Sequence, residues 1–125
     1  MMFVVLDTNV IVLALLSPHG KPAYVFNRFI EGDFTLCADE RILEEYYAVL
    51  SREKFHFDLT YVEQIMSFIR SKAIIVSPTP LAIPFSDESD KKFFEVAKAC
   101  NAVLITGNAK HFPADPLIKS VNDIF

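Results

Sequence analysis

Acidic and amide side chains stand next to the short apolar runs of this chain, and their types and spacing suit metal-assisted chemistry. Asp7 comes directly after the first apolar run, and Asn108 follows the last long one with one glycine between. Asp87 and Asp90 begin the segment that leads into that last run. A cluster of carboxylates without cysteine or histidine is an oxygen-ligand site, which suits Mg²⁺ or Mn²⁺ and not zinc. Such ions activate water and shield the oxygens of a phosphate group.

A pair of glutamates in the middle of the chain offers a further acid. Glu44 and Glu45 lie in a segment whose apolar residues recur at helical spacing, so only one of them faces inward. Periodicity alone leaves the choice between them open. Each acid also has an ordinary structural explanation, because Asp7 can cap a helix and Asp87 and Asp90 suit a helix start. Their joint order and placement favour a functional site.

The elements that position these residues alternate between strands and helices. Apolar, β-branched runs predict buried strands at residues 3–6, 34–37, 73–76, 102–106 and 117–120. Helices are expected over residues 10–16, 22–31 and 39–52, from a Thr60 cap with Glu63 in a capping box, and for about a dozen residues from 86. This order predicts an α/β fold, a three-layer α/β/α sandwich around a mostly parallel sheet. Ligands of such sheets bind beyond the carboxyl ends of the strands.

Length and composition narrow the class of protein. With 125 residues the chain has room for one domain, residues 1–125, and 52% hydrophobic residues exclude a disordered chain. The net charge of −4 argues against binding nucleic acid by bulk electrostatics, although bound cations would reverse the sign at an acidic site. The apolar start is too short for a signal peptide or a membrane span, so we expect a cytoplasmic protein without a membrane partner. Cys37 and Cys100 are expected to be reduced thiols.

Four segments together resemble a PIN domain, and the resemblance covers nearly the whole chain. They are residues 4–10, 42–50, 86–93 and 104–112. The opening Leu-Asp-Thr-Asn and the closing Thr-Gly-Asn-x-Lys-His-Phe are specific when they occur together at this separation. The resemblance implies a PIN-like, Rossmann-like fold. It also implies hydrolysis of RNA phosphodiester bonds by a metal-dependent endoribonuclease.

The resemblance also implies the catalytic residues. Carried over to this sequence, the metal ligands of the family are Asp7, Glu45 and Asp90, holding one or two Mg²⁺ or Mn²⁺ ions. Glu45 is preferred to Glu44 because residues 43–50 follow the family pattern Leu-x-Glu-Tyr-x-x-Val-Leu.

This chain departs from the family at one acidic position. Many relatives carry a fourth acid where this chain has Asn108, so one negative charge is missing. Asn108 can still orient a water or a ligand through its amide, and Asp87 is a candidate for the missing carboxylate. Three polar residues are expected to hold the carboxylates by hydrogen bonds: Thr8, Asn9 and Thr106.

Partners follow from the resemblance and from a few basic residues. Lys91 and Lys92 beside Asp90, and the pair Lys110 and His111, are best placed to contact RNA phosphates near the metal. Small single-domain relatives are often the toxin of a toxin–antitoxin pair and often form homodimers. The resemblance therefore implies an antitoxin protein that covers the site.

Two other function classes compete with the nuclease. The first is a PIN-like module that binds RNA or a protein without cutting, and Asn108 in place of an acid keeps it open. The second is a phosphotransfer domain with Asp7 as the phosphoacceptor. Phosphatases of that kind carry a second aspartate two residues later, but this chain has Asn9, which disfavours the phosphotransfer reading.

Overall fold

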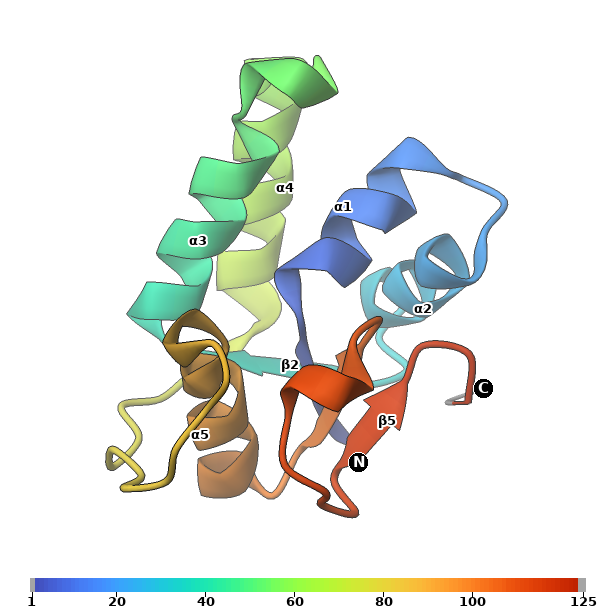
Figure 1. Cartoon of the computed structure of the whole chain (residues 1–125). Coiled ribbons are helices and arrows are strands. Elements are labelled where there is room, and N and C mark those ends of the chain that lie inside the picture. The colour runs from blue at the N-terminus through green and yellow to red at the C-terminus, as the bar shows by residue number, and fades with distance from the viewer. Residues whose placement is uncertain (1, 124–125) are drawn as a thin grey trace.

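Five parallel strands form the sheet in the computed structural model, which describes residues 2–123 (Figure 1). The strands are β1 (Phe3–Leu6), β2 (Thr35–Ala38), β3 (Ile74–Ile75), β4 (Val103–Thr106) and β5 (Ile118–Ser120). Their order is β3-β2-β1-β4-β5, and every neighbouring pair is parallel. β1, β2 and β4 are largely buried, which explains why their sequences are apolar without alternation. The predicted α/β fold is confirmed.

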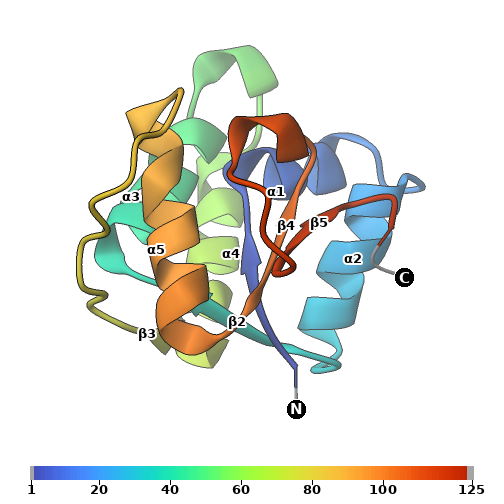
Figure 2. The same ribbon diagram turned by 60° about the horizontal axis from the view of Figure 1, so that its bottom comes forward.

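Helices cover both faces of this sheet. They are α1 (Thr8–Leu16), α2 (Lys21–Ile30), α3 (Glu40–Leu50), α4 (Leu59–Lys72) and α5 (Lys91–Cys100), with 3₁₀ turns at Glu53–Phe55, Glu88–Asp90 and Ala109–His111. α5 packs against β1, β2 and β4, and α1, α2 and α4 lie on the opposite side (Figure 2). α3 packs against α1, α4 and α5. The chain therefore forms the three-layer α/β/α arrangement that the sequence predicts.

Side-chain caps decide where two of the helices begin. The Asp39 carboxylate accepts the Ile42 N–H at 3.0 Å and caps α3, which begins at the next residue, Glu40. The cap predicted at Thr60 is wrong, because α4 already begins at Leu59. Asp58 caps this helix instead, accepting the Thr60 N–H at 2.8 Å. Aspartate at this position satisfies a free N–H of the first turn and also favours the positive end of the helix dipole.

Two other helix starts also differ from the sequence prediction. α1 begins at Thr8, two residues earlier than expected, so Thr8 and Asn9 belong to its first turn. The helix expected from residue 86 begins only at Lys91, after the 3₁₀ turn Glu88–Asp90. Asp87 accepts a hydrogen bond from the Ser89 N–H at 2.9 Å and thereby closes a local turn that competes with the helix.

The proline-containing segment 77–85 is a loop, and a buried carboxylate fastens it to the core. Glu95 of α5 is 4% exposed and accepts the Leu81 N–H at 2.7 Å. Its other oxygen accepts a hydrogen bond from Arg41 at 3.0 Å, and Arg41 in turn donates to Asp39. This network fixes the path of the chain just before the turn that carries Asp90.

Cys37 and Cys100 are both free thiols, as the sequence predicts. Burial, together with the neighbouring Cys100, raises the pKa of the Cys37 thiol to about 12. Between residues 2 and 123, no helix is both long and apolar enough to span a membrane.

Candidate functional site

Asp7 lies where two central strands end side by side. Leu6 of β1 pairs with Ile105 of β4, and the Asp7 N–H donates to the Ile105 carbonyl at 3.0 Å. The hydroxyl of Thr106, which ends β4 and is fully buried, donates to Asp7 Oδ2 at 2.7 Å. Asp7 is the N-cap residue of α1 but makes no side-chain capping bond there. The predicted hydrogen bond from Thr106 to a site carboxylate is present.

Asp7 is only 7% exposed, and its environment changes its acidity. Burial raises the pKa of the Asp7 carboxyl, and the charge of Glu45 raises it further. The hydrogen bonds from Thr106 and the Thr8 backbone, and the charge of Lys92, act in the opposite direction without cancelling the rise. A carboxylate that is buried beside another carboxylate favours a bound cation.

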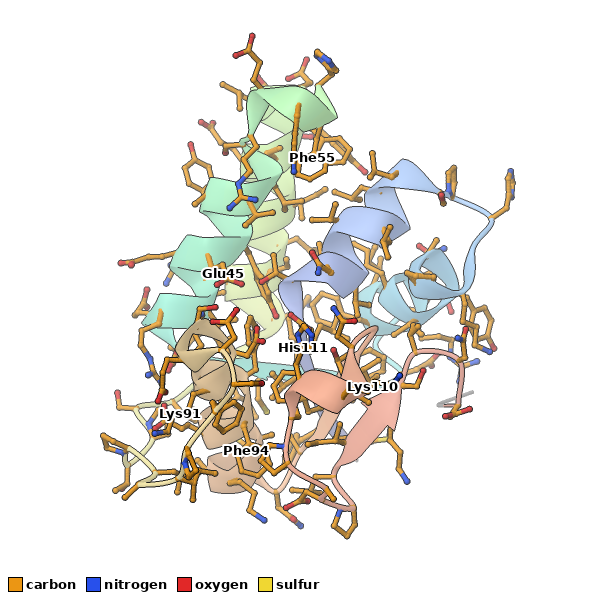
Figure 3. The ribbon with its side chains drawn as sticks, viewed as in Figure 1. Glu45, Phe55, Lys91, Phe94, Lys110 and His111 are labelled. Atoms are coloured by element: carbon orange, nitrogen blue, oxygen red, sulfur yellow. The ribbon has the colours of Figure 1, made fainter. Side chains whose placement is uncertain are left out.

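Glu45 reaches the same place from α3. The Thr8 hydroxyl donates to Glu45 Oε2, and Lys92 Nζ lies 2.7 Å from Glu45 Oε1. Tyr46 is fully buried, and its hydroxyl donates to the Leu6 carbonyl at the end of β1. This bond holds α3 against the strand that delivers Asp7. Figure 3 shows Glu45 on α3, above the turn that carries His111.

Glu44 points elsewhere, which separates the two glutamates that periodicity left open. Its side chain is exposed and lines a groove between α3 and α4, together with Tyr47 and Arg70. Glu45, and not Glu44, is therefore the glutamate next to Thr8. Its role as a metal ligand stays a prediction.

Asp90 completes the acidic group from the start of α5. Burial raises the pKa of the Asp90 carboxyl, and the negative charges of Asp7 and Asp87 raise it further. His111 Nδ1 lies 3.7 Å from Asp90 Oδ2, and the positive charges of His111 and Lys92 act against the rise. Asp7 therefore interacts electrostatically with two acids from distant parts of the sequence, Glu45 and Asp90.

Three other predicted site residues are exposed, and among the described residues none of their side chains is hydrogen-bonded to Asp7, Glu45 or Asp90. Asp87 is exposed, and its carboxylate accepts both the N–H and the hydroxyl of Ser89. These bonds lower the pKa of Asp87. Asn108 is exposed and contributes its backbone N–H to Thr106 Oγ1 at 3.0 Å. Asn9 lies on the exposed side of α1, and within residues 2–123 no hydrogen bond joins its side chain to a carboxylate of the site.

The four basic candidates are placed unequally. Lys92 enters the acidic group, whereas Lys91 reaches Glu88 at 3.9 Å. His111 borders the group, and Lys110 is exposed on the same 3₁₀ turn (Figure 3). Lys92 and His111 are therefore the two basic side chains beside the acids.

Sequence reasoning missed the positioning role of Tyr46 and the partner of Lys92. In the sequence analysis Tyr46 had no role of its own. The hydroxyl of a buried tyrosine usually needs a hydrogen-bond acceptor. A tyrosine among the apolar residues of a helix is therefore a signal that its hydroxyl bonds to another element, here the carbonyl at the end of a strand. No feature of the sequence predicts the Lys92–Glu45 pair, because the two residues come into contact only through the packing of α3 against α5.

The donor chemistry of the acidic group fits a hard divalent cation. Asp7 and Asp90 offer partly buried oxygen ligands, and the negative charge of Asp7 raises the pKa of the Asp90 carboxyl. Across residues 2–123, no three acidic, histidine or cysteine side chains already enclose an ion position. Lys92 and Thr8 hold Glu45 in this arrangement, so a small movement of side chains would accompany binding.

Removing the Thr106 hydroxyl should loosen Asp7. We expect Thr106→Val to lower the affinity for Mn²⁺ about 10–100-fold, because residues that orient a ligand contribute about that much. Calorimetric titration with Mn²⁺ measures the change, and the exposed Thr60→Val is the control for losing a threonine hydroxyl. An affinity within about twofold of the unaltered protein would show that Asp7 needs no such support.

Comparisons with known proteins agree with this geometry. The family model of the PIN domain matches residues 3–110. The chain is 31% identical over 108 residues to an uncharacterized protein, MJ1680, of Methanocaldococcus jannaschii, across 84% of this chain and 70% of that protein. It also shares its fold with a chain in the crystal structure of VapBC2 from Rickettsia felis bound to a DNA fragment from their promoter. That match has a TM-score of 0.63 at 20% identity and covers 95% of this chain and 98% of the other.

The matched region runs from β1 through the turn that carries Lys110, so it includes every acid of the site. This chain belongs to the PIN domain family.

Proposed function

We propose that this protein is a Mg²⁺- or Mn²⁺-dependent endoribonuclease that hydrolyses RNA phosphodiester bonds. The observation that supports the proposal is that the Asp7 carboxylate, at the carboxyl edge of the sheet where ligands of such folds bind, interacts with the charge of Glu45 and with that of Asp90. Membership of the PIN domain family supports the same activity. The three acids are the proposed metal ligands.

The residues around the acids have different roles in such a reaction: some position the carboxylates and others contact the substrate. A bound Mg²⁺ or Mn²⁺ would supply Lewis acidity and the activation of water. Thr106 holds the Asp7 carboxylate by its hydroxyl, and Thr8 does the same for Glu45. Lys92 places positive charge beside the acids, where a phosphate of the substrate approaches, and His111 adds to that charge when it is protonated. An anionic chain can in this way accept an anionic substrate.

The proposal extends to partners. The chain shares its fold with one from VapBC2, whose crystal structure also contains promoter DNA. Together with the PIN family membership, this supports a role as the toxin of a toxin–antitoxin pair. The homodimer and the cytoplasmic location are carried over from the sequence analysis as parts of the proposal. Co-purification with the product of an adjacent reading frame tests the antitoxin, and light scattering of the purified chain tests the dimer.

A binding module without nuclease activity is the alternative, and the exposed, uncharged Asn108 favours it. Such a module would bind RNA or a protein through the same edge of the sheet. Loss of metal binding would then leave its affinity for the partner unchanged.

Cleavage of a mixed RNA pool with Mg²⁺ or Mn²⁺ decides between the two. We expect cleavage by the unaltered chain, its loss with a chelator, and its loss in Asp90→Asn and Glu45→Gln. Glu44→Gln is the matched control, because Glu44 neighbours Glu45 but faces the groove between α3 and α4. Absence of cleavage by the unaltered chain would contradict the nuclease, and equal cleavage by all variants would identify a contaminant.

A further inference from the structure

Lys92 is held in the acidic group by three separate contacts. Its ammonium lies 2.7 Å from Glu45 Oε1, donates to the Ser89 carbonyl, and stands 5.0 Å from the centre of the Phe93 ring. Its side chain is 13% exposed, although lysine usually extends into solvent. An ammonium fixed in this way is part of the site and not a mobile surface charge.

Its positive charge reaches the other acids as well. Lys92 lowers the pKa of Asp7, Asp87 and Asp90, against the effect of burial at Asp7 and Asp90. The neighbouring Lys91 contacts none of these acids and reaches only the exposed Glu88. One of two consecutive lysines therefore serves as the counter-cation of the site.

The Glu45 carboxylate is already engaged at both oxygens. Thr8 donates to Oε2, and the Lys92 ammonium pairs with Oε1. Paired metal ions stand about 3.5–4 Å apart and need several anionic ligands between them.

We propose that Lys92 is the second cation of this site. One divalent ion binds beside Asp7 and Asp90, and the Lys92 ammonium takes the place beside Glu45 that a second ion would fill. The inference rests on the proposed function and specifies that the nuclease site holds one divalent ion. Glu45 still has lone pairs for the ion, because a carboxylate accepts about four interactions.

This arrangement also gives Lys92 a role toward the substrate. Glu45 and Ser89 use two of the three N–H donors of the ammonium in the part of the chain that the structure describes. The third donor remains for a nonbridging oxygen of the scissile phosphate. There a fixed ammonium stabilises developing negative charge, as a second metal ion would.

Calorimetric titration of the metal-stripped full chain with Mn²⁺ tests the count without RNA. We expect one Mn²⁺ per chain for the unaltered protein and for Lys92→Arg, which keeps the positive charge. Lys92→Met keeps the length of the side chain but leaves Glu45 without its cation, so we expect two Mn²⁺ per chain. Lys91→Met is the matched control, because it removes the same charge one residue away, and we expect one Mn²⁺.

Three outcomes would overturn the inference: two ions in the unaltered chain, no ion in the unaltered chain, or the same single ion in Lys92→Met as in Lys91→Met. The first two need no variant, so a folding defect in Lys92→Met cannot hide them. RNA cleavage together with two ions in the unaltered chain would remove the inference and leave the nuclease. The expected counts without any cleavage would remove the nuclease and leave the role of Lys92.

Discussion

Asp7→Asn is expected to make the metal-free protein more stable while it abolishes RNA cleavage. The charge of Asp7 is buried at 7% exposure beside Glu45, so the folded state carries an unfavourable charge that asparagine removes. The asparagine carbonyl can still accept the Thr106 hydroxyl. We expect a gain of about 1 kcal/mol, or roughly 4 °C in Tm, as when a destabilised active-site residue is relieved. Cleavage should fall at least about a thousandfold with the loss of the metal ligand.

The same residue predicts how stability depends on pH. Because burial raises the folded-state pKa of Asp7 above its ordinary value of 3.8, the folded protein binds this proton more tightly than the unfolded chain. The contribution of Asp7 to stability is therefore fully present below the ordinary pKa and is lost as the pH rises through the folded pKa. Asp90 is shifted in the same direction and adds to the effect.

Thermal melts in a chelator, from about pH 4 to pH 8, measure both effects. The stability of Asp7→Asn relative to the unaltered protein should increase with pH in this range, because only the unaltered protein develops the buried charge. Asp87→Asn is the control, since its pKa is lowered and its carboxylate is exposed. If the stability difference between Asp7→Asn and the unaltered protein did not change with pH, burial would not destabilise the charged form of Asp7.

Sequence reasoning located the acids that follow or precede regular elements. Asp7 was identified because it ends an apolar run, and a parallel sheet brings the ends of its strands to one edge. The family resemblance also implied that Thr106 would support a carboxylate, and in the structure its hydroxyl donates to Asp7. Glu45 needed the family resemblance, since helical periodicity allows either glutamate to face inward.

Local competition for hydrogen bonds explains most of the errors. Thr60 has the sequence features of a capping box, but Asp58 two residues earlier takes the Thr60 N–H first. Asp87 has the features of a helix-start acid, yet its bond to Ser89 closes a separate turn. Contacts between distant elements, such as Lys92 with Glu45, leave no trace in periodicity. They require the relative placement of α3 and α5, which depends on packing of the whole core.

The buried carboxylate of Glu95 should contribute more to folding than any exposed acid of the chain. Glu95→Ala leaves the Leu81 N–H and the Arg41 guanidinium without the partner that now lies at 2.7 and 3.0 Å. We expect a loss of about 2–3 kcal/mol in the free energy of unfolding, because the desolvation of a buried donor is no longer offset by a hydrogen bond. Urea denaturation measures this loss. Arg41 keeps its bond to Asp39 and is half exposed, which limits the loss.

The position of Glu95 extends this prediction to the site. Its bond to Leu81 fastens the loop 77–85, and that loop leads into the turn that carries Asp90. Glu95→Ala should therefore weaken Mn²⁺ binding in the protein that remains folded, and it should increase hydrogen exchange at the Leu81 amide. Glu40→Ala is the control, because it breaks an exposed ion pair with Arg70 and should leave stability and Mn²⁺ affinity nearly unchanged. Equal effects of the two substitutions would mean that the loop needs no buried anchor, and that packing of its apolar residues alone sets the position of Asp90.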